Sequence, residues 1–261
     1  MTAAGFAFLG TSGAVASAER DNTSLVVKAG DVALLMDCGG SAVHRLRRLG
    51  VDPLALTHVV VTHLHVDHAY GLPSLVQQLG LLERTTPLTI VCRPEHVDSL
   101  RTLLTVFRVW ERADMFAVAL APIDLAIGAP AFATGPLRVS TAPNAHGAMP
   151  NFAVRVDAGA RAFVYSSDTQ PSEAVVALAR GADVLVHEAT FAERDRTPSR
   201  GATHSSAADA GRIAAAAGVG RLILTHVGPA YHADVAVLAR EARLHFAGSI
   251  EVADELRFYS V

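Results

Sequence analysis

The pattern of apolar and polar positions along the chain has two different periods, one typical of strands and one typical of helices. Short apolar, often β-branched runs predict strands. These runs lie at residues 5–10, 24–28, 32–37, 58–62, 88–92, 162–166, 184–187 and 222–225. Apolar residues at helical spacing predict helices between them. These segments lie at residues 41–49, 74–82, 172–180 and 205–217. Strands that alternate with helices in this way predict an α/β protein.

Several predicted strands end directly at side chains that can carry chemistry. The run 58–62 leads into a histidine cluster, and three later strands end near Asp168, at Glu188 and at His226. The carboxyl ends of strands are where α/β sheets place their sites. No linker or low-complexity tract interrupts the chain, so we expect one domain over residues 1–261. The least regular stretch, 93–121, is expected to be helical and lid-like.

The histidine cluster is the strongest chemical signal in the sequence. His63, His65, Asp67 and His68 lie within six residues. Imidazole and carboxylate groups suit zinc, manganese or iron. Alternation along the segment places His63 and His65 on one side, and Asp67 and His68 can reach a second centre. Because each metal ion needs about three or four protein ligands, more donors must come from elsewhere.

Strand ends in the second half of the chain supply candidates for these further donors. His146, Asp168 and His226 are such positions. Asp168 could bridge two ions because a carboxylate has two oxygens. Two metal ions about 3.5–4 Å apart could share a water and lower its pKa, which would give a hydroxide nucleophile at neutral pH.

Composition narrows the range of partners and compartments. Hydrophobic residues make up 51% of the 261 positions, and the net charge is −3 at a pI of about 6.4. A long nucleic acid partner usually needs a basic face, which this charge does not provide. Cys38 and Cys92 are the two cysteines, too few for a disulfide framework. With neither a basic leader nor a membrane-length apolar run, we expect a cytoplasmic protein away from the membrane.

The cluster resembles the metal-binding motif of the metallo-β-lactamase superfamily, and most closely that of its ribonuclease Z branch. In the cluster segment, residues 62–68 read THLHVDH and are followed by Gly71-Leu72-Pro73. Other segments resemble family motifs in the same order along the chain. They are residues 9–13 (LGTSG), 35–39 (LMDCG), 165–169 (YSSDT), 187–191 (HEATF), 203–206 (THSS) and 224–226 (LTH).

The resemblance implies an αββα sandwich, in which two mixed β-sheets are flanked by helices. It also implies two divalent metal ions, with zinc expected and manganese or iron as alternatives. One ion would be held by His63, His65 and His146, and the other by Asp67, His68 and His226, with Asp168 between them. In this branch, the position of His204 implies a general acid and that of Glu188 a carboxylate that orients it. Asp67 is expected to serve in catalysis as well as in metal binding, and a homodimer is compatible with the resemblance.

The sequence departs from the branch in two places. Ribonuclease Z enzymes that process tRNA usually carry a protruding arm between the third histidine motif and the bridging aspartate. Here residues 151–164 between His146 and Asp168 predict a simple hairpin, so no arm fits. Together with the low charge, this argues against tRNA and favours a small or unstructured phosphodiester. Ser167 also stands where the family commonly has glycine.

Two other functions are consistent with the same residues. A dinuclear centre of this type can also hydrolyse a lactone, a thioester or an aryl sulfate, because an activated hydroxide attacks carbonyl, sulfuryl and phosphoryl centres alike. A structural or regulatory metal protein without turnover is the third interpretation. The sequence argues against that third function, because all seven expected ligand positions are filled and both Glu188 and His204 are present.

Overall fold

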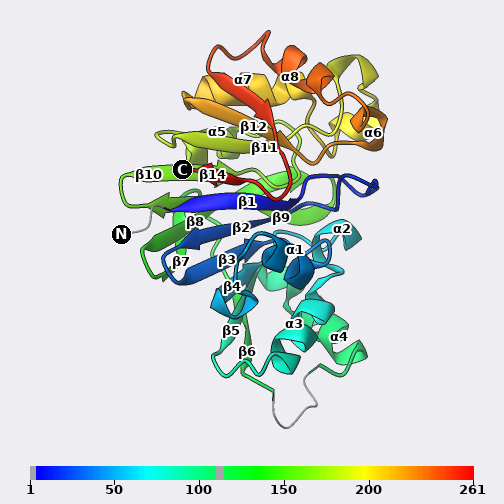
Figure 1. Cartoon of the computed structure of the whole chain (residues 1–261). Coiled ribbons are helices and arrows are strands. Elements are labelled where there is room, and N and C mark those ends of the chain that lie inside the picture. The colour runs from blue at the N-terminus through cyan, green and yellow to red at the C-terminus, as the bar shows by residue number, and fades with distance from the viewer. Residues whose placement is uncertain (1–3, 110–114) are drawn as a thin grey trace.

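The computed structural model describes residues 4–109 and 115–261 and forms two seven-stranded sheets (Figure 1). The first sheet has the order β14 (Phe258–Ser260), β1 (Gly5–Gly10), β2 (Ser24–Ala29), β3 (Val32–Met36), β4 (Leu56–Val60), β5 (Leu88–Cys92) and β6 (Val118–Pro122). The second has the order β13 (Ser249–Val252), β12 (Arg221–Thr225), β11 (Val184–Glu188), β10 (Arg161–Tyr165), β9 (Met149–Ala158), β8 (Leu137–His146) and β7 (Ala129–Thr134).

Helices cover the outer face of each sheet. The first sheet is covered by α1 (Ala42–Arg48), α3 (Leu72–Leu81) and α4 (Val97–Val106), and the second by α5 (Glu173–Ala179), α7 (Ala207–Ala217) and α8 (Ala236–Ala242) (Figure 1). The short helices α2 (Val66–Ala69) and α6 (Pro198–Gly201) lie at the end of the sandwich. Short 3₁₀ turns lie at Pro53–Ala55, Pro94–His96, Glu193–Asp195 and Pro229–Tyr231.

Apolar side chains form three separate layers in this arrangement. One layer packs α5, α7 and α8 against the second sheet, and another packs α1, α3 and α4 against the first. The third layer fills the space between the sheets with aliphatic side chains and several aromatic rings, and Phe6 stacks on Phe163 at a centroid distance of 4.5 Å. Burial of this apolar area drives the docking of the layers. The predicted αββα sandwich with two mixed sheets is therefore confirmed.

The strand order explains why the predicted chemistry gathers at one end. Each sheet combines antiparallel strands with a run of parallel ones, β3 to β6 in the first and β10 to β13 in the second. Parallel strands present their carboxyl ends at the same edge. The segments that follow β4, β10, β11 and β12 therefore meet across the sandwich.

Most inner strands agree with the prediction, whereas β8 and the edge strands were not predicted. Strand β4 begins at Leu56, two residues earlier than expected, and β5 has the predicted bounds. Strands β6, β7, β13 and β14 were missed, since most of their residues are only partly buried or exposed, and β8 was missed as well. In the stretch 93–121, α4 confirms the helical expectation over Val97–Val106, but the expectation is wrong from Val118 onward, where β6 is a strand. Residues 110–114, including Trp110, lie outside the described part.

Arg84 supports the fold from a buried position. Its guanidinium group donates hydrogen bonds to four backbone carbonyls, those of Leu54, Leu56, Thr86 and Pro87. Only 5% of the residue is exposed. These bonds join the start of β4 to the segment that precedes β5.

Replacement of Arg84 by methionine should lower the free energy of unfolding by about 3 kcal/mol, because buried carbonyls lose charge-assisted hydrogen bonds. Urea denaturation followed by circular dichroism measures this change. The matched control is Arg138→Met at an exposed strand position. Unfolding of both variants at the same urea concentration would contradict the assigned role of Arg84.

Among the helices of the described residues, none combines the length and the apolar character that crossing a bilayer requires.

Candidate metal centre

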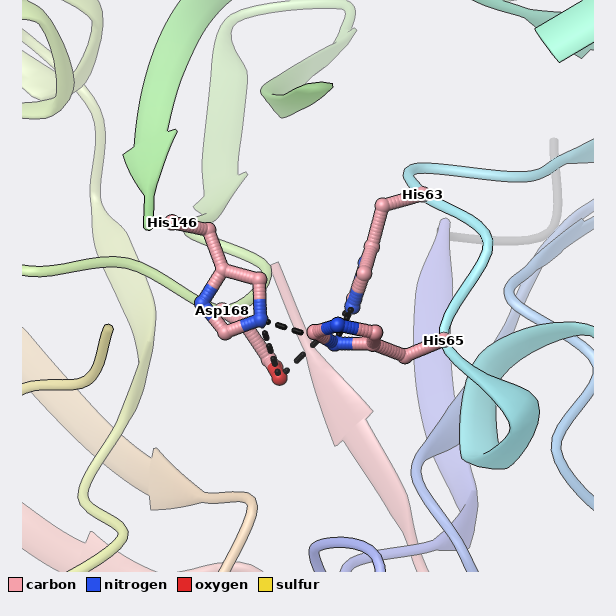
Figure 2. A group of neighbouring side chains, drawn as sticks. All are labelled: His63, His65, His146 and Asp168. Carbon is pink, nitrogen blue, oxygen red and sulfur yellow. Dashed lines mark hydrogen bonds and ion pairs between the residues drawn. The ribbon is translucent and has the colours of Figure 1, made fainter. Parts of the chain in front are cut away.

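Four side chains from three segments converge on one point at the end of the sandwich. Nδ1 of His65 lies 3.1 Å from Nε2 of His63 and 2.9 Å from Nε2 of His146 (Figure 2). Oδ2 of Asp168 lies 3.8 Å from His63 Nε2 and 3.7 Å from His146 Nε2. A proton on one nitrogen can satisfy only one of the His65 contacts, whereas a cation between the nitrogens would satisfy all of them. This group could hold one metal ion.

A second group lies beside the first and shares Asp168 with it. Oδ2 of Asp67 lies 3.5 Å from His68 Nε2 and 3.4 Å from His226 Nε2. Oδ1 of Asp168 lies 3.3 Å from His68 Nε2, and its Oδ2 lies 3.1 Å from His226 Nε2. His68 Nε2 and Asp168 Oδ1 are buried without a hydrogen-bond partner. A bound cation would satisfy both of these atoms, because each can act as a metal ligand.

Most of the histidines in these groups are oriented by a hydrogen bond on their outer nitrogen. Nδ1 of His68 lies 2.8 Å from Asp37 Oδ2, and Nδ1 of His146 lies 2.6 Å from the Thr203 carbonyl. Nδ1 of His226 lies 2.9 Å from Thr190 Oγ1. Since the outer nitrogen carries the proton in such pairs, the inner nitrogen keeps a lone pair for a metal ion.

The electrostatics of the centre favour a positive charge between the two groups. Burial alone would raise the pKa of Asp168, but the surrounding histidines, led by His226 and His68, hold it well below its usual range. Burial lowers the pKa of His63 well below its usual value, which keeps that ring neutral. Burial would also lower the pKa of His68, but Asp168 and Asp37 outweigh it and raise that pKa. The carboxylates that favour a proton there also favour a metal cation.

His204 and Glu188 lie directly beside this centre and touch each other. Nδ1 of His204 lies 3.0 Å from Glu188 Oε1. Burial would lower the pKa of His204, but the Glu188 carboxylate outweighs it and raises that pKa to about 9. Bound divalent cations would lower it again, since like charges repel. The side chain is 21% exposed, so its Nε2 is the nitrogen available to a substrate.

Glu188 is fixed as an acceptor on both of its oxygens. Oε1 also accepts a bond of 2.6 Å from the backbone N–H of Thr169, and Oε2 accepts one of 2.7 Å from the Thr190 hydroxyl. Through Thr190 it is linked to His226. The His204–Glu188 pair, which could move a proton, therefore belongs to the same hydrogen-bonded network as His226, a candidate metal ligand.

A cavity of about 170 Å³ opens onto these side chains. It reaches His65, Asp67, Asp168, His204 and His226, and its remaining wall consists of Gly13, Ala14, Val15, Thr190, Gly228 and Pro229. No lysine or arginine lines it among the residues that the structure describes. The remaining wall therefore consists of small and mostly apolar residues, and the cavity admits a compact chemical group.

Every residue predicted for the site lies at this centre, and the structure adds several that the sequence did not indicate. Asp37, Thr190 and Thr203 were quoted only as parts of motifs, without a role. Asp37 follows strand β3 as Asp168 follows β10, so its strand-end position was a usable signal. The Thr203 carbonyl carries no sequence signal, because any residue has one.

Gly39 allows the cluster to lie close to strand β3. A Cβ at this position would be 1.8 Å from the carbonyl oxygen of Asp67. Gly39→Ala should therefore lower the free energy of unfolding by about 3 kcal/mol through overpacking. It should also weaken metal binding, because Asp67 must shift. Thermal unfolding and a zinc titration measure the two effects.

Gly220→Ala is the control for Gly39→Ala, since its nearest contact would be an ordinary 3.7 Å. Equal behaviour of the two alanine variants would show that the close approach of Gly39 to Asp67 is unimportant.

Comparisons with known proteins agree with this geometry. Residues 33–227 match the family model described as a beta-lactamase superfamily domain. Ribonuclease Z of Halorubrum lacusprofundi is 32% identical, over 95% of this chain and 94% of that protein. The fold is similar to that of the metallo-beta-lactamase fold protein YhfI from Bacillus subtilis (TM-score 0.82, 23% identity, 99% and 100% of the two chains). It is also similar to the short form of human tRNase Z (TM-score 0.80, 21% identity, 98% and 99%).

Fold, site and comparisons together define a class. The chain belongs to the beta-lactamase superfamily and is a metal-dependent hydrolase of the metallo-β-lactamase fold. Within that superfamily it belongs to the ribonuclease Z-like branch.

Proposed function

We propose that this hydrolase is a phosphodiesterase with two divalent metal ions, preferably zinc, between the donor groups described above. The observation that supports this proposal most directly is the shared Asp168, one oxygen of which faces His68 while the other faces His63, His146 and His226. Such a pair of ions would lower the pKa of a water and polarise a phosphoryl oxygen. The proposal places residues 1–261 in one domain, because both sheets contribute donors.

The protein's own residues would bind and orient the substrate around that centre. Asp168 and Asp67 place negative charge where cations must be held, and Asp67 also faces the cavity. His204 would donate a proton from Nε2 to the leaving oxygen, and Glu188 would hold its ring through Nδ1. A histidine fixed by a carboxylate in this way is a common general acid.

The substrate class is the finer part of the proposal, and we favour a small or unstructured phosphodiester. Between His146 and Asp168 the structure has only β9, the turn at Gly159 and β10, so no arm protrudes there. The alignment with the Halorubrum protein runs over 292 positions although this chain has 261 residues, so that relative carries additional segments. The names of the relatives, ribonuclease Z and tRNase Z, do not support the expectation that tRNA is not a substrate. A tRNA precursor therefore belongs in the test.

A carbonyl or sulfate ester is the second candidate substrate. The observation in its favour is the cavity wall of Gly13, Ala14, Val15, Gly228 and Pro229, without a basic side chain among the described lining residues. A dianionic or polymeric phosphate usually contacts arginine or lysine, whereas a neutral carbonyl ester such as a lactone or a thioester does not need one. The observation therefore favours the carbonyl esters over the sulfate ester.

The deciding experiment is a substrate panel on protein reconstituted with zinc or manganese, with metal content measured on the same sample. The panel contains bis-p-nitrophenyl phosphate, a dinucleotide, a tRNA precursor, a lactone, a thioester and an aryl sulfate. Turnover of the dinucleotide with about two metal ions per chain is expected. Turnover of the neutral or sulfate esters alone would replace the proposal by the second candidate. A chain that binds no metal would overturn both.

A further inference from the structure

Two asparagines from the β8–β9 hairpin hold the loop that carries Asp168. Asn144 and Asn151 stand opposite each other in the strand register. Nδ2 of Asn151 donates to the Asp168 carbonyl at 2.7 Å, and Nδ2 of Asn144 donates to the same carbonyl at 3.1 Å and to that of Ser166 at 2.6 Å. The backbone carbonyl of Asp168 is thus held by hydrogen bonds from two strands.

The orientation of both amide groups is fixed. Oδ1 of Asn144 accepts the N–H of Ala145 at 2.9 Å, and Oδ1 of Asn151 accepts the N–H of Phe152 at 2.7 Å. A flipped amide would place oxygen against carbonyl oxygen and nitrogen against an N–H. The asparagines therefore act as rigid donors toward the Asp168 loop.

Ser167 completes this arrangement from a strained position. Its φ is 53°, in the left-handed region that glycine adopts without cost. This chain nevertheless has a serine side chain there. The hydroxyl is fully buried, 2.7 Å from Thr62 Oγ1 and 3.2 Å from Asn151 Oδ1. A side chain retained at a strained position next to a site points to a role for its hydroxyl.

The Ser167 contact crosses from one sheet to the other. Oγ1 of Thr62 lies 2.9 Å from both oxygens of Asp37, which can only accept as a carboxylate. The single Thr62 proton therefore goes to Asp37, and the Thr62 oxygen is left to accept from Ser167 at 2.7 Å, a bond that shares the one Ser167 proton with the longer contact of 3.2 Å to Asn151 Oδ1. Asp37 also accepts from His68 Nδ1 at 2.8 Å. The chain of bonds thus joins the Asp168 loop to the segment that carries His63 and His68.

We propose that Ser167, Asn144 and Asn151 form a positioning clamp that fixes Asp168 relative to His63 and His68. The inference rests on the proposed metal-binding function. The donor groups come from different sheets, so a small change in the separation of the sheets would alter every distance between them. The clamp sets that separation directly beneath the donors. Ser167 is a positioning residue, because it acts through Asp168.

Two substitutions of Ser167 separate its hydroxyl from its backbone strain. Ser167→Gly removes both, and Ser167→Ala removes the hydroxyl only. We expect each to weaken the binding of the second zinc ion by roughly 10- to 100-fold, the usual cost of losing an outer-sphere partner. The melting temperature of the metal-free protein should fall for Ser167→Ala and stay level or rise for Ser167→Gly. Competition with a chelator measures the affinity, and the absorption spectrum of the cobalt-loaded protein reports the ligand geometry.

The matched control is Glu83→Gly, which relieves a similar φ of 58° at an exposed position. It should leave zinc affinity and the cobalt spectrum unchanged. Asn144→Ala, at a half-buried position, is the second test of the clamp and should weaken zinc binding as Ser167→Gly does.

Zinc affinity and a cobalt spectrum equal to those of the unchanged protein, in both Ser167→Gly and Asn144→Ala, would overturn the clamp. Since these readouts do not depend on turnover, a chain that binds two zinc ions but hydrolyses no phosphodiester would refute the proposed reaction and still allow the clamp to be supported. A wild-type chain that takes up no zinc would overturn both proposals.

Discussion

Replacement of Asp168 by alanine should abolish phosphodiester hydrolysis and the stable binding of a metal pair together. The carboxylate is the only predicted donor that faces both groups, with its oxygens 3.1–3.8 Å from four histidine nitrogens. Without it, two bound cations would repel each other with no negative charge between them. We expect kcat/KM to fall by about 10³ or more, since loss of one electrostatic stabiliser already costs about 10²–10³. Metal content should fall from about two ions per chain to one or none.

Asp98→Ala is the control for Asp168→Ala, because Asp98 is an exposed carboxylate on α4, outside the donor groups. Mass spectrometry of metal content and steady-state kinetics are measured on both variants. Two tightly bound ions in Asp168→Ala would show that the carboxylate does not bridge.

Replacement of His204 by alanine should slow hydrolysis by about 10²–10⁴, the usual contribution of a positioned general acid. The effect should depend on the leaving group. A nucleoside alkoxide needs a proton as it departs, whereas p-nitrophenolate is stable without one. Hydrolysis of a dinucleotide should therefore fall much more than that of bis-p-nitrophenyl phosphate. Metal content should stay at the wild-type level, because the proposed role of His204 lies outside both donor groups.

His44→Ala is the control for His204→Ala, since His44 is exposed on α1. Equal losses for the two phosphodiesters would argue against proton donation and for a role of His204 in metal or substrate binding. Glu188→Gln should reproduce the leaving-group dependence in weaker form, because the ring of His204 would keep a partner that lacks charge.

Much of the centre could be predicted because its donors follow local signals. His63, His65, Asp67 and His68 share one short segment, and Asp168 and His226 each follow an apolar strand. Parallel strands bring such ends together whatever the details of packing. His146 was the weakest of these predictions from the residues alone, since β8, the strand that it ends, was not recognised.

The outer network could not be predicted, because it depends on how the two sheets dock. The contacts of Asp37 with Tyr165 and of Thr62 with Ser167 join residues more than 100 positions apart. Their geometry is set by the apolar layer between the sheets. No local sequence pattern indicates how that layer packs. The edge strand β7 was not predicted for a related reason. Its residues are half-buried or exposed, and apolar and polar positions do not alternate regularly along it.

The path of the chain between the two sheets also has a consequence for folding. Gly5 of β1 pairs with Ser260 of β14, so the first sheet gains this outer strand only after residue 260 has been synthesised. Contacts across such a long separation form slowly, because a large loop must close. The cluster of residues 63–68 leaves the ribosome early, yet each donor group needs a histidine from the second sheet. A nascent chain therefore could not capture the proposed metal ions at full affinity, and their binding would favour only the finished sandwich by mass action.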